Sequence, residues 1–89
     1  MYRKERMASV MQDLLAREIE KTIDPDGALI TVMGVSLDDD LEKATVSVAV
    51  YPDEKRDSVV RQLNRRAPQL AYFLLKKMQV RKVPLLEFA

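Results

Sequence analysis

The side chains of this sequence that could do chemistry are its cations, which gather in the second half of the chain. Nine Lys and Arg but only two acids, Asp57 and Glu87, fall between Lys55 and Phe88, so this segment has a formal charge of +7. Residues 1–54 hold six Lys and Arg against twelve Asp and Glu, a charge of −6, which leaves the whole chain at +1. Halves of opposite sign predict a charged contact surface on a nearly neutral protein.

Phosphate binding is the chemistry that suits seven of these cations. Lys supplies a point charge, and Arg supplies a planar fork that can hold phosphate oxygens bidentately. The alternative is a solvated helix surface, but the segregation of the acids favours a surface that contacts structured RNA. The residues are Arg61, Arg65, Arg66, Lys76, Lys77, Arg81 and Lys82.

Two further features could contribute to such a surface. Arg3, Lys4 and Arg6 form a smaller basic patch at the start of a helix, where cations oppose the helix dipole. Either a functional contact or an unwound terminus would explain Arg3 and Arg6 there. Tyr72 lies one turn before Lys76 and could stack on a base, but we expect it to cover the edge of the core.

Catalysis has few side chains to work with. The chain contains no His and no Cys, and its serines have no recognisable base beside them. No Gly-rich phosphate loop is present either, so the sequence predicts no enzyme and no cofactor. Asp38, Asp39 and Asp40 are consecutive and lack EF-hand spacing, so we expect no metal site there.

The first half of the chain predicts a helix followed by a β-hairpin. Residues 3–22 are amphipathic, because apolar side chains recur at helical spacing without Pro or Gly. Residues 29–37 are β-branched and apolar, and Gly34 marks either a bulge or a close helix crossing. Residues 42–51 alternate between apolar and small side chains. With a short polar turn between them, the two strands should pair antiparallel.

The second half predicts two helices and a final strand. Asp53 is the expected N-cap of a helix that runs to about Arg65. Pro68 then breaks the helix, because it has no N–H and pushes Ala67 out of the helical region. The strand over 80–88 contains Pro84, so it should lie at a sheet edge or begin after that residue.

The predicted order is therefore αββααβ, a two-layer α+β domain over residues 1–89. A three-stranded mixed sheet would carry the helices on one face. The chain begins without the long apolar run of a signal peptide or a membrane span, so we expect a cytoplasmic protein that contacts no membrane.

This order is similar to that of the type II KH domain, an RNA-binding fold. Within that fold, the sequence resembles the ribosome-binding factor A family over nearly its whole length. The order and spacing of several short pieces carry the resemblance. They are Arg3, Arg6, Asp24-Pro25, Ile30-Thr31-Val32, Val35, Asp40-Leu41, Ala44-Thr45-Val46, Arg81, Val83-Pro84 and Phe88.

Three departures accompany the resemblance. The Gly-x-x-Gly loop with which KH domains usually clamp RNA is absent. The family's Ala-x-Gly kink between the two helices falls on Arg66, Ala67 and Pro68, so that Pro stands in place of Gly. The charged tail that often follows the last Phe in the family does not follow Phe88.

The resemblance implies a ribosome assembly factor that acts by binding. It would bind the free or immature small ribosomal subunit as a monomer and contact ribosomal RNA near its 5′ end. It would thereby help late maturation of that RNA, above all in the cold. A general KH-like RNA-binding module is one alternative. A protein-interaction domain that uses an exposed sheet edge is another.

Overall fold

The computed structural model describes residues 3–89 and confirms the predicted order of elements. The elements are α1 (Lys4–Thr22), β1 (Leu29–Leu37), β2 (Lys43–Tyr51), the short 3₁₀ helix η1 (Asp53–Lys55), α2 (Arg56–Arg65), α3 (Ala67–Met78) and β3 (Leu85–Phe88). None of the helices in this described part of the chain has the length and apolar character needed to cross a membrane.

The three strands form one mixed sheet in the order β1-β2-β3. β1 and β2 pair antiparallel, whereas β2 and β3 pair parallel. The hairpin register shifts between Val32, which faces Val48, and Gly34, which faces Ser47. Met33 is therefore the extra residue of a bulge, which confirms one of the two interpretations of Gly34. The other is wrong, because within residues 3–89 no atom outside Gly34 and its two chain neighbours lies within 4 Å of a Cβ built on Gly34, so no helix crosses close to it.

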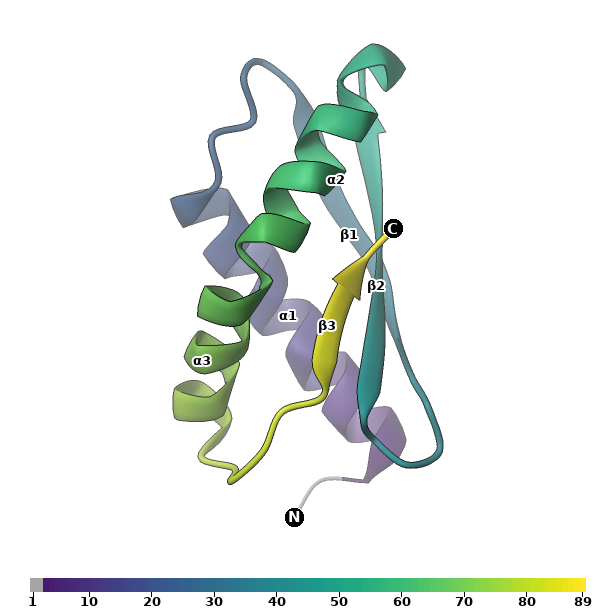
Figure 1. Cartoon of the computed structure of the whole chain (residues 1–89), viewed down its shortest axis with the longest axis vertical. Helices are drawn as coiled ribbons and strands as arrows, with labels where there is room; N and C mark the ends of the chain where they lie inside the picture. Colours follow the sequence, from purple (N-terminus) through teal and green to yellow (C-terminus); the bar gives the residue numbers. More distant parts are fainter. Residues whose placement is uncertain (1–2) are drawn as a thin grey trace.

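All three helices cover the same face of the sheet, as predicted for a two-layer domain (Figure 1). α1 packs on β1, while α2 packs on β2 and β3, and α3 packs on β3. The parallel pairing of β2 and β3 requires a crossover, and α2 and α3 together supply it.

The core lies between these two layers and follows the predicted periodicities. α1 buries Met7, Met11, Leu15 and Ile19 at intervals of four residues. β2 buries alternate residues from Ala44 to Val48, which turns its other face toward solvent. The crossover helices complete the core with Val59, Leu63, Ala67, Leu70, Leu74 and Met78.

The start of α2 differs from the prediction that Asp53 is its N-cap. Pro52 is extended, and its carbonyl accepts a hydrogen bond from the Lys55 N–H at 3.1 Å. This bond closes a 3₁₀ turn over Asp53–Lys55, so α2 begins only at Arg56. The Pro52 carbonyl thus accepts one of the backbone hydrogen bonds that the Asp53 side chain was expected to accept, and neither N-cap residue, Pro52 of η1 or Lys55 of α2, makes a side-chain capping bond.

The break between α2 and α3 is present and lies at Arg66, where φ is −90° and ψ is 0°. The Arg66 N–H closes α2 by bonding to the carbonyls of Gln62 and Leu63, both at 3.1 Å. Ala67 is already the first residue of α3, so the prediction that it leaves the helical region is wrong. Pro68 occupies the second position, where a missing N–H removes no helical hydrogen bond.

The last strand was expected either to lie at a sheet edge or to begin after Pro84, and both are true. β3 starts at Leu85, directly after Pro84, and it forms one edge of the sheet. Pro84 therefore needs no ladder hydrogen bond, and its ring is buried.

Candidate RNA interface

Helix α2 carries the first group of cations on its outer side. Val59 and Leu63 face the core, so Arg61 and Arg65, two residues further along, point in the opposite direction. Arg66 follows at the break, and all three arginines are exposed. The apolar spacing of α2 therefore fixes where these guanidinium groups lie.

A second group lies at the far end of α3. Lys76 and Lys77 occupy its last turn, and Gln79 ends the helix in the left-handed conformation with φ of 55°. Arg81 and Lys82 follow in the connection to β3. Arg66 lies just before α3 and Lys76 ten residues later, so the nearest members of the two groups are about 15 Å apart along the helix. The seven cations thus form two groups joined by one helix.

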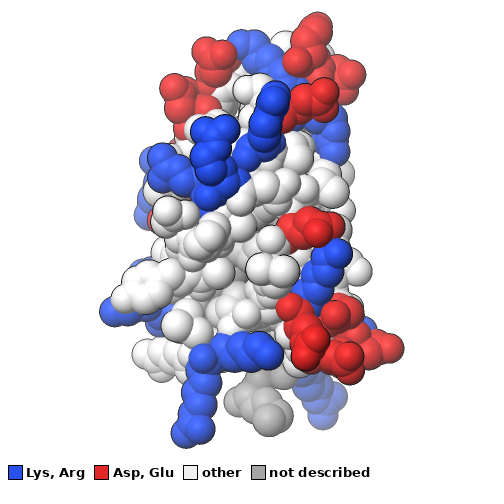
Figure 2. Space-filling model, viewed as in Figure 1, with Lys and Arg blue, Asp and Glu red and all other residues white. Residues whose placement is uncertain are grey.

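The surface of the molecule shows the same division. Figure 2 shows Lys and Arg atoms gathered over α2 and again near the end of α3, with uncharged side chains between the two groups. Asp and Glu atoms gather instead near the β1–β2 turn and at the opposite end of the molecule. The two basic groups are therefore distinct on this face, and Asp and Glu atoms border both of them.

None of the nine cations predicted to bind RNA forms an ion pair within residues 3–89. The three ion pairs in this part of the chain join Lys4 to Asp39, Lys43 to Glu87 and Lys55 to Asp26. Cations whose charge is not matched by a neighbouring carboxylate leave a positive surface for an anionic partner. The nine are Arg3, Arg6, Arg61, Arg65, Arg66, Lys76, Lys77, Arg81 and Lys82.

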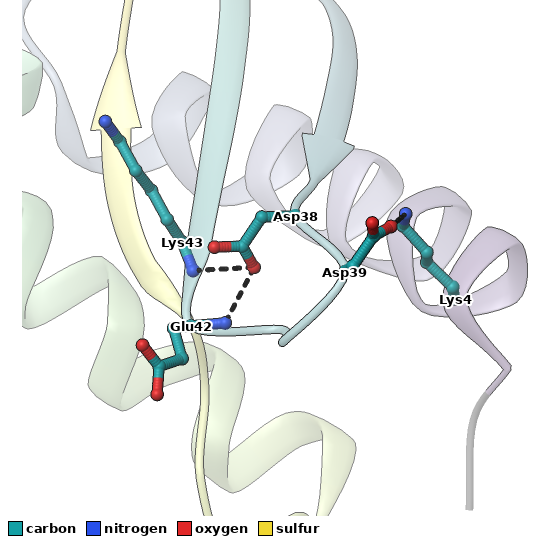
Figure 3. A network of polar contacts seen from close by, with 5 residues as sticks. All are labelled: Lys4, Asp38, Asp39, Glu42 and Lys43. Atoms are coloured by element: carbon teal, nitrogen blue, oxygen red, sulfur yellow. Dashed lines mark hydrogen bonds and ion pairs between the residues drawn. The ribbon is translucent and has the colours of Figure 1, made fainter.

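The patch at the start of α1 is smaller than the sequence suggested. Lys4 Nζ donates a hydrogen bond of 2.9 Å to the Asp39 carboxylate in the β1–β2 turn (Figure 3). This bond raises the pKa of Lys4 and lowers the pKa of Asp39. Arg3 and Arg6 remain exposed at the same end of the long axis as the α3–β3 connection (Figure 1).

The consecutive aspartates have separate structural roles. The Asp38 carboxylate accepts hydrogen bonds from the backbone N–H groups of Glu42 and Lys43, at 2.8 and 3.2 Å, and so closes the turn (Figure 3). Asp39 points away from it toward Lys4. Within residues 3–89, no group of three acidic side chains is arranged to hold a metal ion.

Tyr72 differs from the expectation that it covers the core edge. Its side chain is 60% exposed, and Lys76 Nζ lies over the ring, 5.4 Å from the centroid. The physical reason is its spacing, because Tyr72 lies two residues from both Leu70 and Leu74, which face the core. The four-residue separation of Tyr72 and Lys76 is the signal that could have predicted this contact.

The hydrogen bonds that anchor α2 were not anticipated from the sequence. The Asn64 side chain accepts a bond from the Phe88 N–H at 2.8 Å and donates one to the Phe88 carbonyl at 3.0 Å. Arg56 Nη1 donates to the Val48 carbonyl at 2.9 Å. These bonds fix α2 against both strands that it crosses, and with it the orientation of the neighbouring Arg61 and Arg65.

Comparison with known proteins gives the same family throughout. The family model described as ribosome-binding factor A matches residues 3–89. The ribosome-binding factor A of Dichelobacter nodosus is 34% identical over 79 residues, which cover 86% of this chain. The aligned part is 65% of that relative, so the chain spans slightly less than two thirds of its length.

Solved structures agree with the sequence comparison. The crystal structure of ribosome-binding factor A from Thermus thermophilus superposes with a TM-score of 0.84 at 30% identity, covering 99% of this chain and 96% of that one. A homology model of the Thermus thermophilus factor, fitted into a cryo-EM map of a complex between 30S and ribosome-binding factor A, gives a TM-score of 0.76 at 30% identity and covers 91% of this chain and 87% of that one. The chain belongs to the ribosome-binding factor A family.

Proposed function

We propose that this chain is a single-domain assembly factor that binds the free or immature small ribosomal subunit through its RNA. The observation that carries this proposal is the exposure of nine cations, unmatched by carboxylates within residues 3–89, of which seven lie on and around α2 and α3 and two at the start of α1. The Thermus thermophilus relative that was fitted into a 30S complex supports the choice of partner.

The proposed mechanism is selective binding without catalysis. Arg and Lys side chains hold phosphates and supply most of the affinity, while the shape of the surface supplies selectivity. A factor that binds one RNA arrangement better than another shifts the population toward the first. In the cytoplasm, a monomer of this kind would favour correct folding of small-subunit RNA near its 5′ end, with the largest benefit in the cold.

The test reverses one charge at the end of α2 and one in the last turn of α3 while leaving Tyr72 and Lys76 intact. In the double variant Arg65→Glu, Lys77→Glu, each substitution removes an attraction to phosphate and adds a repulsion, so we expect well over tenfold weaker binding to free small subunits. The matched control is Arg17→Glu, Lys21→Glu on α1, which makes the same change in net charge at two exposed cations. Sedimentation at about 50 and 200 mM salt measures both variants.

The salt dependence adds a second readout. Each lost phosphate contact lowers the slope of log affinity against log salt by about 0.7–0.9, so the test variant should lose about 1.4 to 1.8 units of slope. Circular dichroism should show both variants folded, because exposed charges contribute little to stability. Equal binding by the test variant, or equal losses in test and control, would refute an interface on α2 and α3.

RNase treatment separates the proposal from its alternatives. Association with small-subunit proteins should be lost after digestion if RNA mediates binding, and retained if a sheet edge binds protein. At β3 the edge is already occupied beside Phe88 by the Asn64 side chain. A general RNA-binding module would bind unrelated RNA as tightly as it binds the small subunit.

A further inference from the structure

We propose that Tyr72 is a stacking platform for one unpaired base of the bound RNA, flanked by cations that hold the phosphates on either side. The inference rests on the proposed function in taking RNA as the partner. It goes beyond that function in assigning a nucleotide-binding point on α3 and the kind of RNA that the point accepts.

The first support is the position of the Tyr72 ring. The side chain is 60% exposed, whereas Leu70, Leu74 and Met78 of the same helix are buried and Phe73 and Leu75 are half-buried. The structure assigns no hydrogen bond to the Tyr72 hydroxyl within residues 3–89, so the ring is not held there by a polar contact. Exposed aromatic rings are the usual stacking surfaces for bases in RNA-binding domains.

The second support is the arrangement of charge along α3. Arg66 precedes the helix, Tyr72 lies near its middle, and Lys76 occupies its last turn. At 1.5 Å per residue, the helix brings Arg66 and Lys76 to about 15 Å from each other, with Tyr72 between them. A strand of RNA that meets both cations runs along α3, and the contact between Lys76 and the Tyr72 ring places that ring beside its path.

The third support is the character of the surface between the two basic groups. Figure 2 shows mostly uncharged atoms there, so this band offers few contacts to a phosphate. A base can occupy such a surface because its face is apolar. Lys76 Nζ already lies 5.4 Å from the ring centroid, which places a cation beside the stacking position.

The position of Tyr72 also determines whether paired or unpaired RNA can bind to the ring. In a duplex the bases stack on each other and present only their edges, so their faces cannot reach Tyr72. An unpaired nucleotide in a loop, bulge or end can turn its base outward. Stacking tolerates any base, because every base has a π face. Tyr72 should therefore distinguish single-stranded from paired RNA and have little sequence preference.

The test compares three substitutions of Tyr72 with one of Tyr51. Tyr72→Phe keeps the ring, Tyr72→Leu keeps apolar bulk without a ring, and Tyr72→Ala removes both. Tyr51→Ala is the matched control, because Tyr51 is 75% exposed but lies at the end of β2, next to the acids of η1. The probes are a single-stranded RNA of about 12 nucleotides, its duplex with the complementary strand, and free small subunits.

Loss of one stacking contact should weaken binding of the single strand by about 5- to 150-fold for Tyr72→Ala and Tyr72→Leu. Tyr72→Phe and Tyr51→Ala should stay within about twofold of wild type, and binding to the duplex should be the same in all four. The wild-type chain has no Trp, so Tyr72→Trp adds a direct readout. Its fluorescence should be quenched by the single strand and not by the duplex.

Several outcomes would overturn the inference. Stacking would be excluded if Tyr72→Ala bound the single strand as tightly as wild type, or if Tyr72→Leu did. It would also be excluded if a variant lost as much affinity for the duplex as for the single strand. A loss in Tyr51→Ala as large as that in Tyr72→Ala would show a general surface effect. Failure of wild-type protein to bind small subunits would instead refute the proposed function. Normal wild-type binding with an unaffected Tyr72→Ala variant would refute the stacking site alone.

Discussion

Replacing Asn64 by alanine removes both hydrogen bonds between the α2 side chain and the backbone of β3. The Asn64 amide meets the N–H and the carbonyl of Phe88 at 2.8 and 3.0 Å, and both bonds are partly buried. A typical hydrogen bond contributes about 0.5–1.5 kcal/mol to stability, so the pair contributes about 1–3 kcal/mol. Alanine is the better helix former by about 0.6 kcal/mol, which offsets part of the loss. The expected net destabilisation is therefore about 0.5–2.5 kcal/mol.

Urea unfolding followed by circular dichroism measures this change, and hydrogen exchange locates it. The Phe88 amide should exchange faster in Asn64→Ala, because it donates to the Asn64 oxygen in the wild-type protein. Gln69→Ala is a suitable control, since Gln69 is an exposed polar residue on α3 with no side-chain hydrogen bond within residues 3–89. Equal stability of wild type and Asn64→Ala, together with unchanged exchange at Phe88, would refute the role given to this contact.

Three further predictions concern the core, the break between helices and the turn. Leu74→Ala should cost about 2–5 kcal/mol in chemical denaturation, because Leu74 is fully buried, and a loss below about 0.5 kcal/mol would contradict that placement. Pro68→Gly should fold and keep two helices, because the break lies at Arg66, and NMR showing one continuous helix would refute this. The Lys4–Asp39 pair contributes stability that is lost as pH falls through the lowered pKa of Asp39, or rises through the raised pKa of Lys4. Melting temperatures of wild type and Asp39→Asn should therefore differ slightly at neutral pH and coincide in acid.

Local patterns in the sequence were enough to predict most of the elements. The helical spacing in α1 and the alternation in β2 each depend on residues close together in the chain. The same is true of the break near Pro68 and of the start of β3 after Pro84. The bulge beside Gly34 follows from the same kind of local signal. The error at Asp53 is also local, because capping by a side chain and a turn closed by the Pro52 carbonyl satisfy the same backbone N–H groups.

Contacts between distant residues could not be predicted in this way. The bonds from Asn64 to Phe88 depend on the register of β3 against β2 and on the angle of α2, neither of which is local. The same applies to the pair of Lys4 and Asp39, which joins the start of α1 to a turn. The exposure of Tyr72 is different, because its spacing from Leu70 and Leu74 already placed it on the outer face.

The parallel pairing of β2 and β3 has a consequence for the order in which the chain folds. The β1–β2 hairpin joins neighbouring segments, and hairpins of this kind close within about 1–10 μs. Ala44 and Leu86, which pair across β2 and β3, are separated by about forty residues, so their encounter must overcome a larger loop entropy. We expect α1 and the hairpin to form an early unit on which α2, α3 and β3 condense later. In native-state exchange, the crossover that carries most of the cations should therefore open more readily than the hairpin beneath it.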